Sequence, residues 1–137
     1  MPEKSDFKNY IKVCIIDDDE SYRLLLKKVL EIDDRIKLYG EYSTGKSFIK
    51  DLGSPFKPDV CLVDIYLNDI SGIECCKQIK EKKPEVHLIV MTAHPDPQTF
   101  VEARKLGADY LQKGTRVEAI INKIITSYES KRGESLI

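Results

Sequence analysis

Short apolar runs alternate five times with segments of helical periodicity along this chain. The runs that predict strands are Lys12–Asp17, Ile36–Tyr42, Pro58–Asp64, Val86–Thr92 and Ala108–Gln112. The segments that predict helices are Glu20–Asp33, Ser43–Leu52, Ser71–Lys83, Asp96–Leu106 and Thr115–Tyr128. Because most of the strand runs are nearly continuous in apolar residues, we expect strands buried on both faces. The alternation predicts an α/β fold with a doubly wound, five-stranded parallel sheet and five helices.

Several predicted helices carry start or stop signals. Ser71–Glu74 and Thr115–Glu118 both fit a capping box, and Asp96 followed by Pro97 fits an N-cap and a first helical proline. Gly53 is expected to close the second helix.

Length and charge limit what the chain can be. Its 137 residues suit a single domain, 1–137, with a core of about 12–128 and tails at 1–10 and 130–137. The 22 basic and 23 acidic residues give a net charge of −1, which argues against a general nucleic-acid binder. No apolar run reaches the ~18 residues that span a bilayer, and no secretory signal is visible, so we expect no membrane segment.

The four cysteines lack the spacing of a zinc site. They are Cys14, Cys61, Cys75 and Cys76, two within apolar runs and two adjacent. We expect them to be reduced thiols in a cytoplasmic protein.

Acidic, hydroxyl and basic residues follow the predicted strands. In an open parallel sheet, ligands bind at the carboxyl ends of the strands. If the first and third strands are neighbours, Asp17, Asp18 and Asp64 converge there, and oxygen-only ligands of this kind favour Mg²⁺. Lys113 adds an ammonium and Thr92 a hydroxyl, a combination that suits a phosphoryl group placed on Asp64.

Four motifs in order resemble the receiver domain of bacterial two-component response regulators, over about Lys12 to Tyr128. IIDDDE holds the acidic pair, and DVCLVDIYLNDISG holds Asp64 and, eight residues later, Gly72. VMTAH holds Thr92, and GADYLQKG holds Tyr110 and Lys113. The resemblance implies the flavodoxin-like strand order 2-1-3-4-5.

The resemblance also implies a magnesium-dependent phosphorylation. Asp64 would take a phosphoryl group from the phosphohistidine of a histidine kinase or a histidine phosphotransfer protein. Mg²⁺ would be held by Asp18, Asp64 and the backbone carbonyl of Tyr66, with Asp17 acting mainly through metal-bound water. The chain would catalyse only its own phosphorylation and dephosphorylation, so we do not expect an enzyme acting on a separate substrate.

A conformational switch is implied as well. Lys113 and Thr92 would hydrogen-bond the phosphoryl oxygens, and Tyr110 would follow Thr92 inward. The surface formed by the fourth helix, the fifth strand and the fifth helix would then change. That surface is expected to signal to a downstream protein, or to an output domain if the chain belongs to a longer regulator, and it could form a homodimer. Direct nucleic-acid binding is not expected, and exposed Arg23 and Lys27 on the first helix are candidates for kinase docking.

The chain departs from the family in three respects, the third of which involves two residues. Asn68 stands where a proline is usual, and Gly114 replaces the proline that normally follows the lysine, so a cis bond loses its usual basis. Bulky Tyr66 and His94 stand two residues after Asp64 and Thr92, at positions that flank the path of attacking water in the family. We hypothesise that Tyr66 shields the acyl phosphate and lengthens its life.

Two alternatives stay open at this level. Gly40–Ser47 fits the phosphate-binding pattern G-x-x-x-x-G-K-[ST], which would make the chain a nucleotide hydrolase. Its bulky intervening residues, and a first glycine expected within a strand, argue against that role, which would also leave the acids and Lys113 unexplained. The second alternative is an unphosphorylated receiver-like interaction module.

Overall fold

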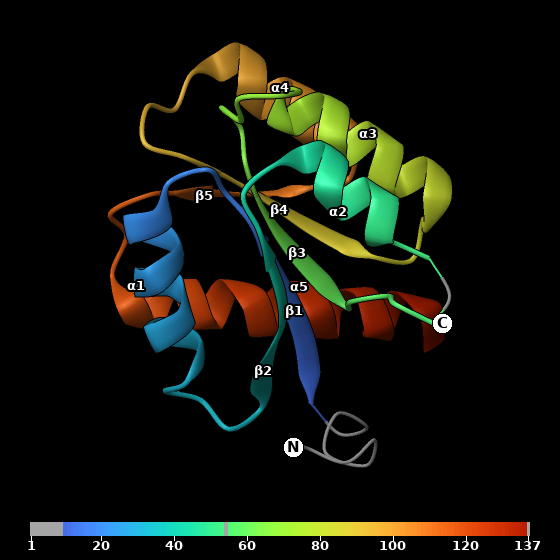
Figure 1. Cartoon of the computed structure of the whole chain (residues 1–137). Coiled ribbons are helices and arrows are strands. Elements are labelled where there is room, and N and C mark those ends of the chain that lie inside the picture. The colour runs from blue at the N-terminus through green and yellow to red at the C-terminus, as the bar shows by residue number, and fades with distance from the viewer. Residues whose placement is uncertain (1–9, 54, 137) are drawn as a thin grey trace.

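The computed structural model describes residues 10–53 and 55–136, except for the side chains of 131–136. Strands and helices alternate as predicted (Figure 1). The strands are β1 (Ile11–Ile16), β2 (Ile36–Tyr42), β3 (Val60–Asp64), β4 (His87–Thr92) and β5 (Asp109–Gln112). The helices are α1 (Glu20–Leu30), α2 (Gly45–Asp51), α3 (Gly72–Lys82), α4 (Pro97–Lys105) and α5 (Val117–Leu136).

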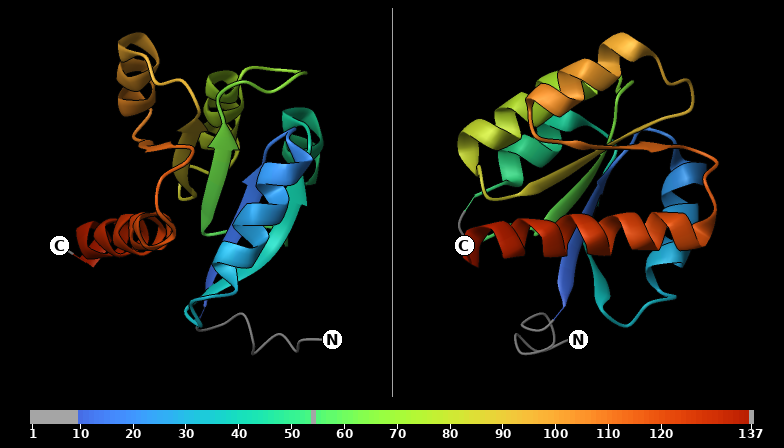
Figure 2. Two further views of the ribbon diagram at one scale, coloured as in Figure 1. Left: turned by 90° about the vertical axis from the view of Figure 1, so that its left-hand side faces the viewer. Right: turned by 180° about the vertical axis from the view of Figure 1, so that it is seen from behind.

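All five strands are parallel and lie in the order β2-β1-β3-β4-β5, which confirms the expected order. Helices α1 and α5 cover one face of the sheet, and α2, α3 and α4 cover the other (Figure 2). Because the strands run the same way, their carboxyl ends and the loops that follow them lie along one edge. The order puts β3 at the centre, between β1 and β4.

Two apolar clusters, one on each face, hold the helices to the sheet. Leu26 and Leu30 of α1 and Ile120 and Ile124 of α5 are buried in the first cluster. The second cluster buries α2 and α3 side chains such as Phe48 against the opposite face. All five residues of β3 are buried, which is why this strand is apolar at every position except its terminal Asp64. Burying one large aliphatic side chain contributes roughly 1.5–3 kcal/mol.

Three helix N-caps set the geometry of loops at the carboxyl edge. Asp19 caps α1, Ser71 caps α3 by accepting from the Glu74 amide, and Asp96 caps α4 next to Pro97. The predictions for Ser71 and Asp96 are therefore confirmed.

Helix α2 ends at Asp51 with Leu52 as its C-cap, so it stops just before Gly53 as expected, although Gly53 does not take up a left-handed conformation. The capping box at Thr115 was wrong. The Thr115 hydroxyl donates back to the Gln112 carbonyl, and α5 starts two residues later, at Val117.

The structure continues α5 as a helix to Leu136, where we had expected a tail from residue 130. No proline interrupts the sequence of this last helix, so its backbone hydrogen bonds can continue. Residues 1–9 and 137, parts of the two expected tails, lie outside the described residues. No helix within the described residues is long and apolar enough to cross a membrane.

Among the glycines whose surroundings the structure describes, Gly72 has the least space around it. A Cβ atom there would lie 2.1 Å from the Asp64 carbonyl oxygen and 2.6 Å from the Ile65 Cα. Both neighbours are backbone atoms that cannot rotate away, so α3 can approach the end of β3 this closely only with glycine at this position. The Gly72 amide also donates to the Ile65 carbonyl at 2.8 Å.

We predict that Gly72→Ala lowers the free energy of unfolding by about 2–4 kcal/mol, because the added methyl forces α3 away from β3. Gly53→Ala is the matched control, since a Cβ there meets no atom within 4 Å. Urea unfolding of the two variants tests the difference. If Gly72→Ala and Gly53→Ala were equally stable, the close packing of α3 against the end of β3 would not need glycine at position 72.

Candidate functional site

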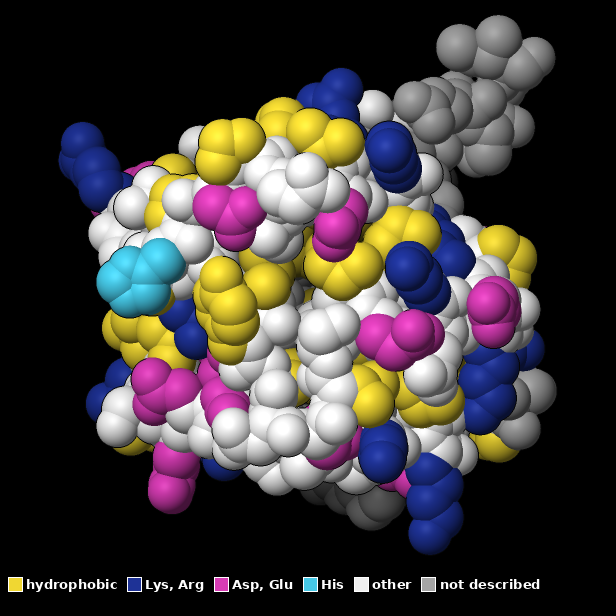
Figure 3. Space-filling view, turned by 90° about the horizontal axis from the view of Figure 1, so that it is seen from above, with side chains coloured by type: hydrophobic (Ala, Val, Ile, Leu, Met, Phe, Trp, Pro, Cys, Tyr) yellow, Lys and Arg dark blue, Asp and Glu magenta, His cyan; other side chains and the backbone are white. Residues whose placement is uncertain are grey.

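The carboxyl edge of the sheet gathers residues from four separate stretches of chain. Asp17 follows β1, Asp64 ends β3, Thr92 ends β4 and Lys113 follows β5. Asp17, Asp18 and Asp64 each offer a carboxylate oxygen within 4.8 Å of the others. Figure 3, seen from above, shows acidic and hydrophobic side chains intermingled over the loops that follow the strands. The predicted convergence of the three acids is present.

Two of the three acids are buried. Asp17 is fully buried and Asp64 is 5% exposed, whereas Asp18 is partly exposed. One oxygen of Asp17 accepts from the Asp19 amide at 2.9 Å, and one oxygen of Asp64 accepts from the Tyr66 amide at 3.3 Å. These bonds fix the carboxylates from the loops that follow their strands.

Lys113 is the cation of the cluster. Its Nζ lies 2.8 Å from Asp17 Oδ2 and 3.4 Å from Asp64 Oδ2. Burial by itself lowers the pKa of Lys113, but the Asp17 and Asp64 carboxylates outweigh it and the pKa is raised. The lysine is therefore charged at neutral pH.

Asp64 is a strongly perturbed acid. Burial and the negative charge of Asp17 raise its pKa to about 6, against the lowering effect of the Lys113 ammonium. A perturbed carboxyl at the edge of a sheet, beside a specific cation, is a candidate functional group.

The donor set fits a divalent cation. Three carboxylates face one ammonium, so excess negative charge remains in the cluster. Asp17 Oδ2 is buried and accepts no hydrogen bond of standard geometry; its contact is the Lys113 ammonium. Oxygen ligands of this kind suit Mg²⁺, which is held by a few carboxylates together with water.

Thr92 and Lys113 are linked through the backbone. The Lys113 amide donates to the Thr92 carbonyl at 2.7 Å, and the Thr92 hydroxyl accepts from the His94 amide at 3.1 Å. The next residue, Gly114, has φ +89°, a conformation closed to proline. Gly114 therefore gives this turn a geometry that the usual proline could not adopt.

The other predicted residues lie around this cluster. Tyr110 lies on β5, and its ring meets Phe100 of α4 edge-on at 5.4 Å between centroids. Tyr66 is 58% exposed and His94 is exposed.

Tyr22 of α1 also lies beside this cluster, and no motif in the sequence singled it out. Its ring lies against the Lys113 ammonium, with 4.6 Å between Nζ and the ring centroid. In the sequence, its helical spacing with Leu26 and Val29 places Tyr22 in the apolar stripe of the first helix. A tyrosine in the first turn of a helix that follows an acidic strand end is the signal that could have found it.

The expected exposure of Arg23 was wrong, whereas the Lys27 side chain is 35% exposed. The Arg23 side chain is only 15% exposed, and it donates to the Asp17 carbonyl at 2.6 Å. Arg23 and Lys27 both pair with Glu41 of β2, at 3.1 and 2.7 Å. Both cations are thus partly neutralised, and Arg23 acts as a support for the acidic loop.

The structure also decides against the phosphate-binding loop. Gly40 lies within β2, paired with Cys14 of β1, so it cannot form a loop. The amides of Gly45 and Lys46 donate to the Asp69 carboxylate at 3.0 and 2.7 Å. A nucleotide phosphate would have to displace that carboxylate.

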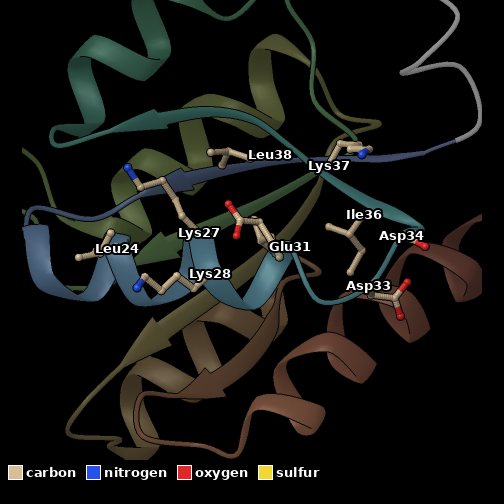
Figure 4. A pocket seen from close by; sticks show the side chains of 10 residues that line it. Leu24, Lys27, Lys28, Glu31, Asp33, Asp34, Ile36, Lys37 and Leu38 are labelled. Carbon is tan, nitrogen blue, oxygen red and sulfur yellow. The ribbon is translucent and has the colours of Figure 1, made fainter. Parts of the chain in front are cut away.

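A pocket of about 440 Å³ lies between α1 and β2 (Figure 4). Leu24 and Lys28 line it from the helix, and Ile36 and Leu38 line it from the strand. None of the three clustered acids contributes to its wall. The candidate chemistry therefore lies at the carboxyl edge and not in this hollow.

Comparison with known proteins agrees with this geometry. The family model described as the response regulator receiver domain matches residues 13–125. The chain belongs to this family. Response regulators serve two-component signalling, and the family resemblance inferred from the four motifs is confirmed.

Individual relatives are regulators of the same kind. The chain is 36% identical over 112 residues to the transcriptional regulatory protein YdfI of Bacillus subtilis, a match that covers 81% of this chain and 52% of YdfI. A receiver domain protein (CheY-like) from Methanospirillum hungatei JF-1 superposes with a TM-score of 0.81, at 22% identity, over 91% of this chain and 98% of that one. The beryllofluoride-activated NtrC4 receiver domain dimer superposes with a TM-score of 0.78, at 30% identity, over 88% and 98%. The chain spans about half the length of the curated relatives it matches.

We predict that Asp64→Asn raises the free energy of unfolding at pH 7 by about 1–2 kcal/mol, allowing for solvent screening. The folded pKa of about 6 lies above the ordinary value of 3.8, so the folded protein holds this proton more tightly. The stability gained from that proton is complete below about pH 4 and is lost as the pH rises through 6. The gap between variant and parent should therefore close at pH 4.

Urea unfolding at pH 4 and pH 7 measures this gap. Asp34→Asn, which removes an exposed acid outside the cluster, is the control and should be nearly neutral at both pH values. If Asp64→Asn were less stable than its parent at pH 7, the claim that repulsion between Asp17 and Asp64 destabilises the folded protein would be wrong.

Proposed function

We propose that this receiver domain accepts a phosphoryl group on Asp64 from the phosphohistidine of a histidine kinase or histidine phosphotransfer protein. The observation that carries the proposal is the buried Asp64 carboxylate, which lies between two further acids and the Lys113 ammonium. An Asp64 oxygen attacks phosphorus, the oxygen–phosphorus bond forms and the phosphorus–nitrogen bond breaks. The electron pair of the broken bond stays on the histidine nitrogen of the donor.

The residues proposed to hold Mg²⁺ are Asp17, Asp18 and Asp64, together with the backbone carbonyl of Tyr66. Bound there, the ion supplies positive charge against the phosphoryl oxygens. Asp17 and Asp64 are buried, which makes their electrostatic interactions strong.

Lys113 and Thr92 are proposed to bind the phosphoryl oxygens. The Lys113 Nζ lies 3.4 Å from Asp64 Oδ2, so a group carried on that oxygen would lie within reach of the ammonium. Thr92 is 1% exposed, and its hydroxyl can donate while it keeps the His94 amide as its own donor. Most of the catalysis is then positioning and charge neutralisation.

The signal is proposed to leave through the α4-β5-α5 face. Tyr110 and Phe100 line an apolar hollow of about 400 Å³ there, with Val101 beside them. Phe100 and Val101 are each more than 40% exposed, so this face carries apolar surface that a partner could cover. Inward movement of Thr92 would draw Tyr110 with it and change this hollow.

Downstream, we propose contact with a target protein or, in a longer regulator, with its own output domain, and a homodimer through the same face. The NtrC4 receiver domain that superposes on this chain forms a dimer when activated by beryllofluoride. We assign the reaction to the cytoplasm, where four free, buried cysteines of this kind stay reduced. Direct contact with nucleic acid or membrane is not part of the proposal.

We predict that acetyl phosphate and Mg²⁺ add one phosphoryl group to the protein, seen by intact mass, and that beryllofluoride shifts NMR signals around Asp64. Asp64→Asn should abolish both, because the accepting oxygen is replaced by an amide. Removing Mg²⁺ with EDTA should also prevent the addition. Asp34→Asn, which changes an exposed acid outside the cluster, should be modified as the parent is.

If the Asp64→Asn protein were phosphorylated as fully as the parent, the phosphoryl acceptor would be a residue other than Asp64. A parent protein that takes up neither phosphoryl group nor beryllofluoride would favour the receiver-like interaction module instead.

We predict that Tyr66→Asn shortens the life of the phosphorylated form by several-fold. Tyr66 is exposed at the rim, and its amide donates to Asp64, so its ring is available to cover the approach of water. Loss of phosphorylated protein over time, followed by intact mass, measures the rate. A rate equal to or slower than that of the parent rejects shielding by Tyr66.

A further inference from the structure

Lys113 makes one contact at this site that does not involve an acid. Its ammonium lies over the ring of Tyr22, with 4.6 Å between Nζ and the ring centroid. This separation is within the ~6 Å over which an aromatic face attracts a cation. The Lys113 side chain is 14% exposed, so little water competes for it.

The backbone around Lys113 restrains the lysine less than a proline would. Gly114 follows it at φ +89°, in a turn built from the residue type with the most conformational freedom. Lys113 itself is tied to β4 by its amide, which donates to the Thr92 carbonyl. That bond fixes the backbone of Lys113, but it leaves the rotamer of the side chain, and so the position of the ammonium, undetermined.

The backbone of Tyr22 is tied to the same loop that carries the acids. The Tyr22 amide donates to the carboxylate of Asp19, the N-cap of α1, at 3.3 Å. The neighbouring Arg23 donates to the Asp17 carbonyl at 2.6 Å. The first turn of α1 and the acidic loop therefore form one unit, while the Tyr22 side chain packs against the apolar cluster on this face of the sheet.

The ring, and not the hydroxyl, is the part of Tyr22 in contact with the lysine. The Tyr22 hydroxyl is buried and has no hydrogen-bond partner among the described residues. Phenylalanine would keep the contact, whereas an aliphatic side chain would remove it.

We propose that Tyr22 is a positioning residue for Lys113, whose ring holds the ammonium over Asp17 and Asp64 in place of the restraint that a proline at position 114 would give. The inference rests on the proposed phosphorylation of Asp64. With the ring removed, the long lysine side chain samples other rotamers and the ammonium is less often beside Asp64.

The test compares Tyr22→Phe with Tyr22→Leu for the rate of phosphorylation by acetyl phosphate. We expect Tyr22→Phe to react within twofold of the parent and Tyr22→Leu about tenfold more slowly. Tyr22→Met fills the space without a ring and replaces Tyr22→Leu if that variant does not fold. Tyr39→Leu is the matched control, since the Tyr39 ring lies under the Lys12 ammonium, at 5.1 Å, and makes no contact with Lys113.

A second measurement reports on the contact without any reaction. The ε-methylene protons of Lys113, assigned by their loss in Lys113→Arg, should be shifted upfield by the ring in the parent and in Tyr22→Phe. They should lie at ordinary values in Tyr22→Leu and Tyr22→Met. A merely structural role of Tyr22 would not give this pattern.

The outcomes separate the two proposals. If the parent is phosphorylated and Tyr22→Leu reacts as fast, or if Tyr22→Phe is as slow as Tyr22→Leu, the positioning role is wrong while the proposed function stands. If the parent shows no upfield shift of the Lys113 protons, the positioning role is also wrong. If the parent takes up no phosphoryl group, the proposed function fails and this role fails with it.

Discussion

Repulsion between Asp17 and Asp64, held in check by Lys113, is the interaction on which the site depends. The parallel order puts β1 beside β3. Asp17, which follows β1, and Asp64, which ends β3, therefore lie close together. Water is largely excluded from both, which strengthens their mutual repulsion and leaves one ammonium to offset it. The site is built as an unsatisfied negative cluster, and it gains stability from whatever positive charge enters it.

The scaffold keeps this unfavourable arrangement in place through backbone contacts. Gly72 lets α3 approach the end of β3, and Asp69 ties the loop between them to the start of α2. On the other side, Arg23 holds the carbonyl of Asp17 from the first turn of α1. The rigid sheet contributes position, while the loops contribute polar partners. This division is the usual one in open α/β folds, where function lies on loops supported by a rigid scaffold.

Apolar patterning was sufficient for the order of the elements and for a parallel sheet. The strand order came from the resemblance of the motifs to the receiver family, and the convergence of the three acids follows from that order. The sequence was insufficient where a contact joins residues far apart in the chain. The pairing of Arg23 and Lys27 with Glu41 needs the register of β2 beside α1, which no local pattern specifies. Tyr22 looked like an ordinary helical core residue because its partner, Lys113, lies at the other end of the chain. The helix continuing to Leu136 shows the weakness of boundary predictions where no proline ends a helix.

The Asp69 carboxylate, which accepts from the first amides of α2, bears on how phosphate-binding motifs are interpreted in sequences. A glycine-lysine-serine string after a strand offers backbone amides to an anion, and here the chain provides that anion itself. The same sequence pattern can therefore join two loops of one chain. A carboxylate side chain then accepts the hydrogen bonds that a nucleotide phosphate accepts in a nucleotide-binding protein. Whether such a string binds a ligand depends on which acid lies opposite it in the fold.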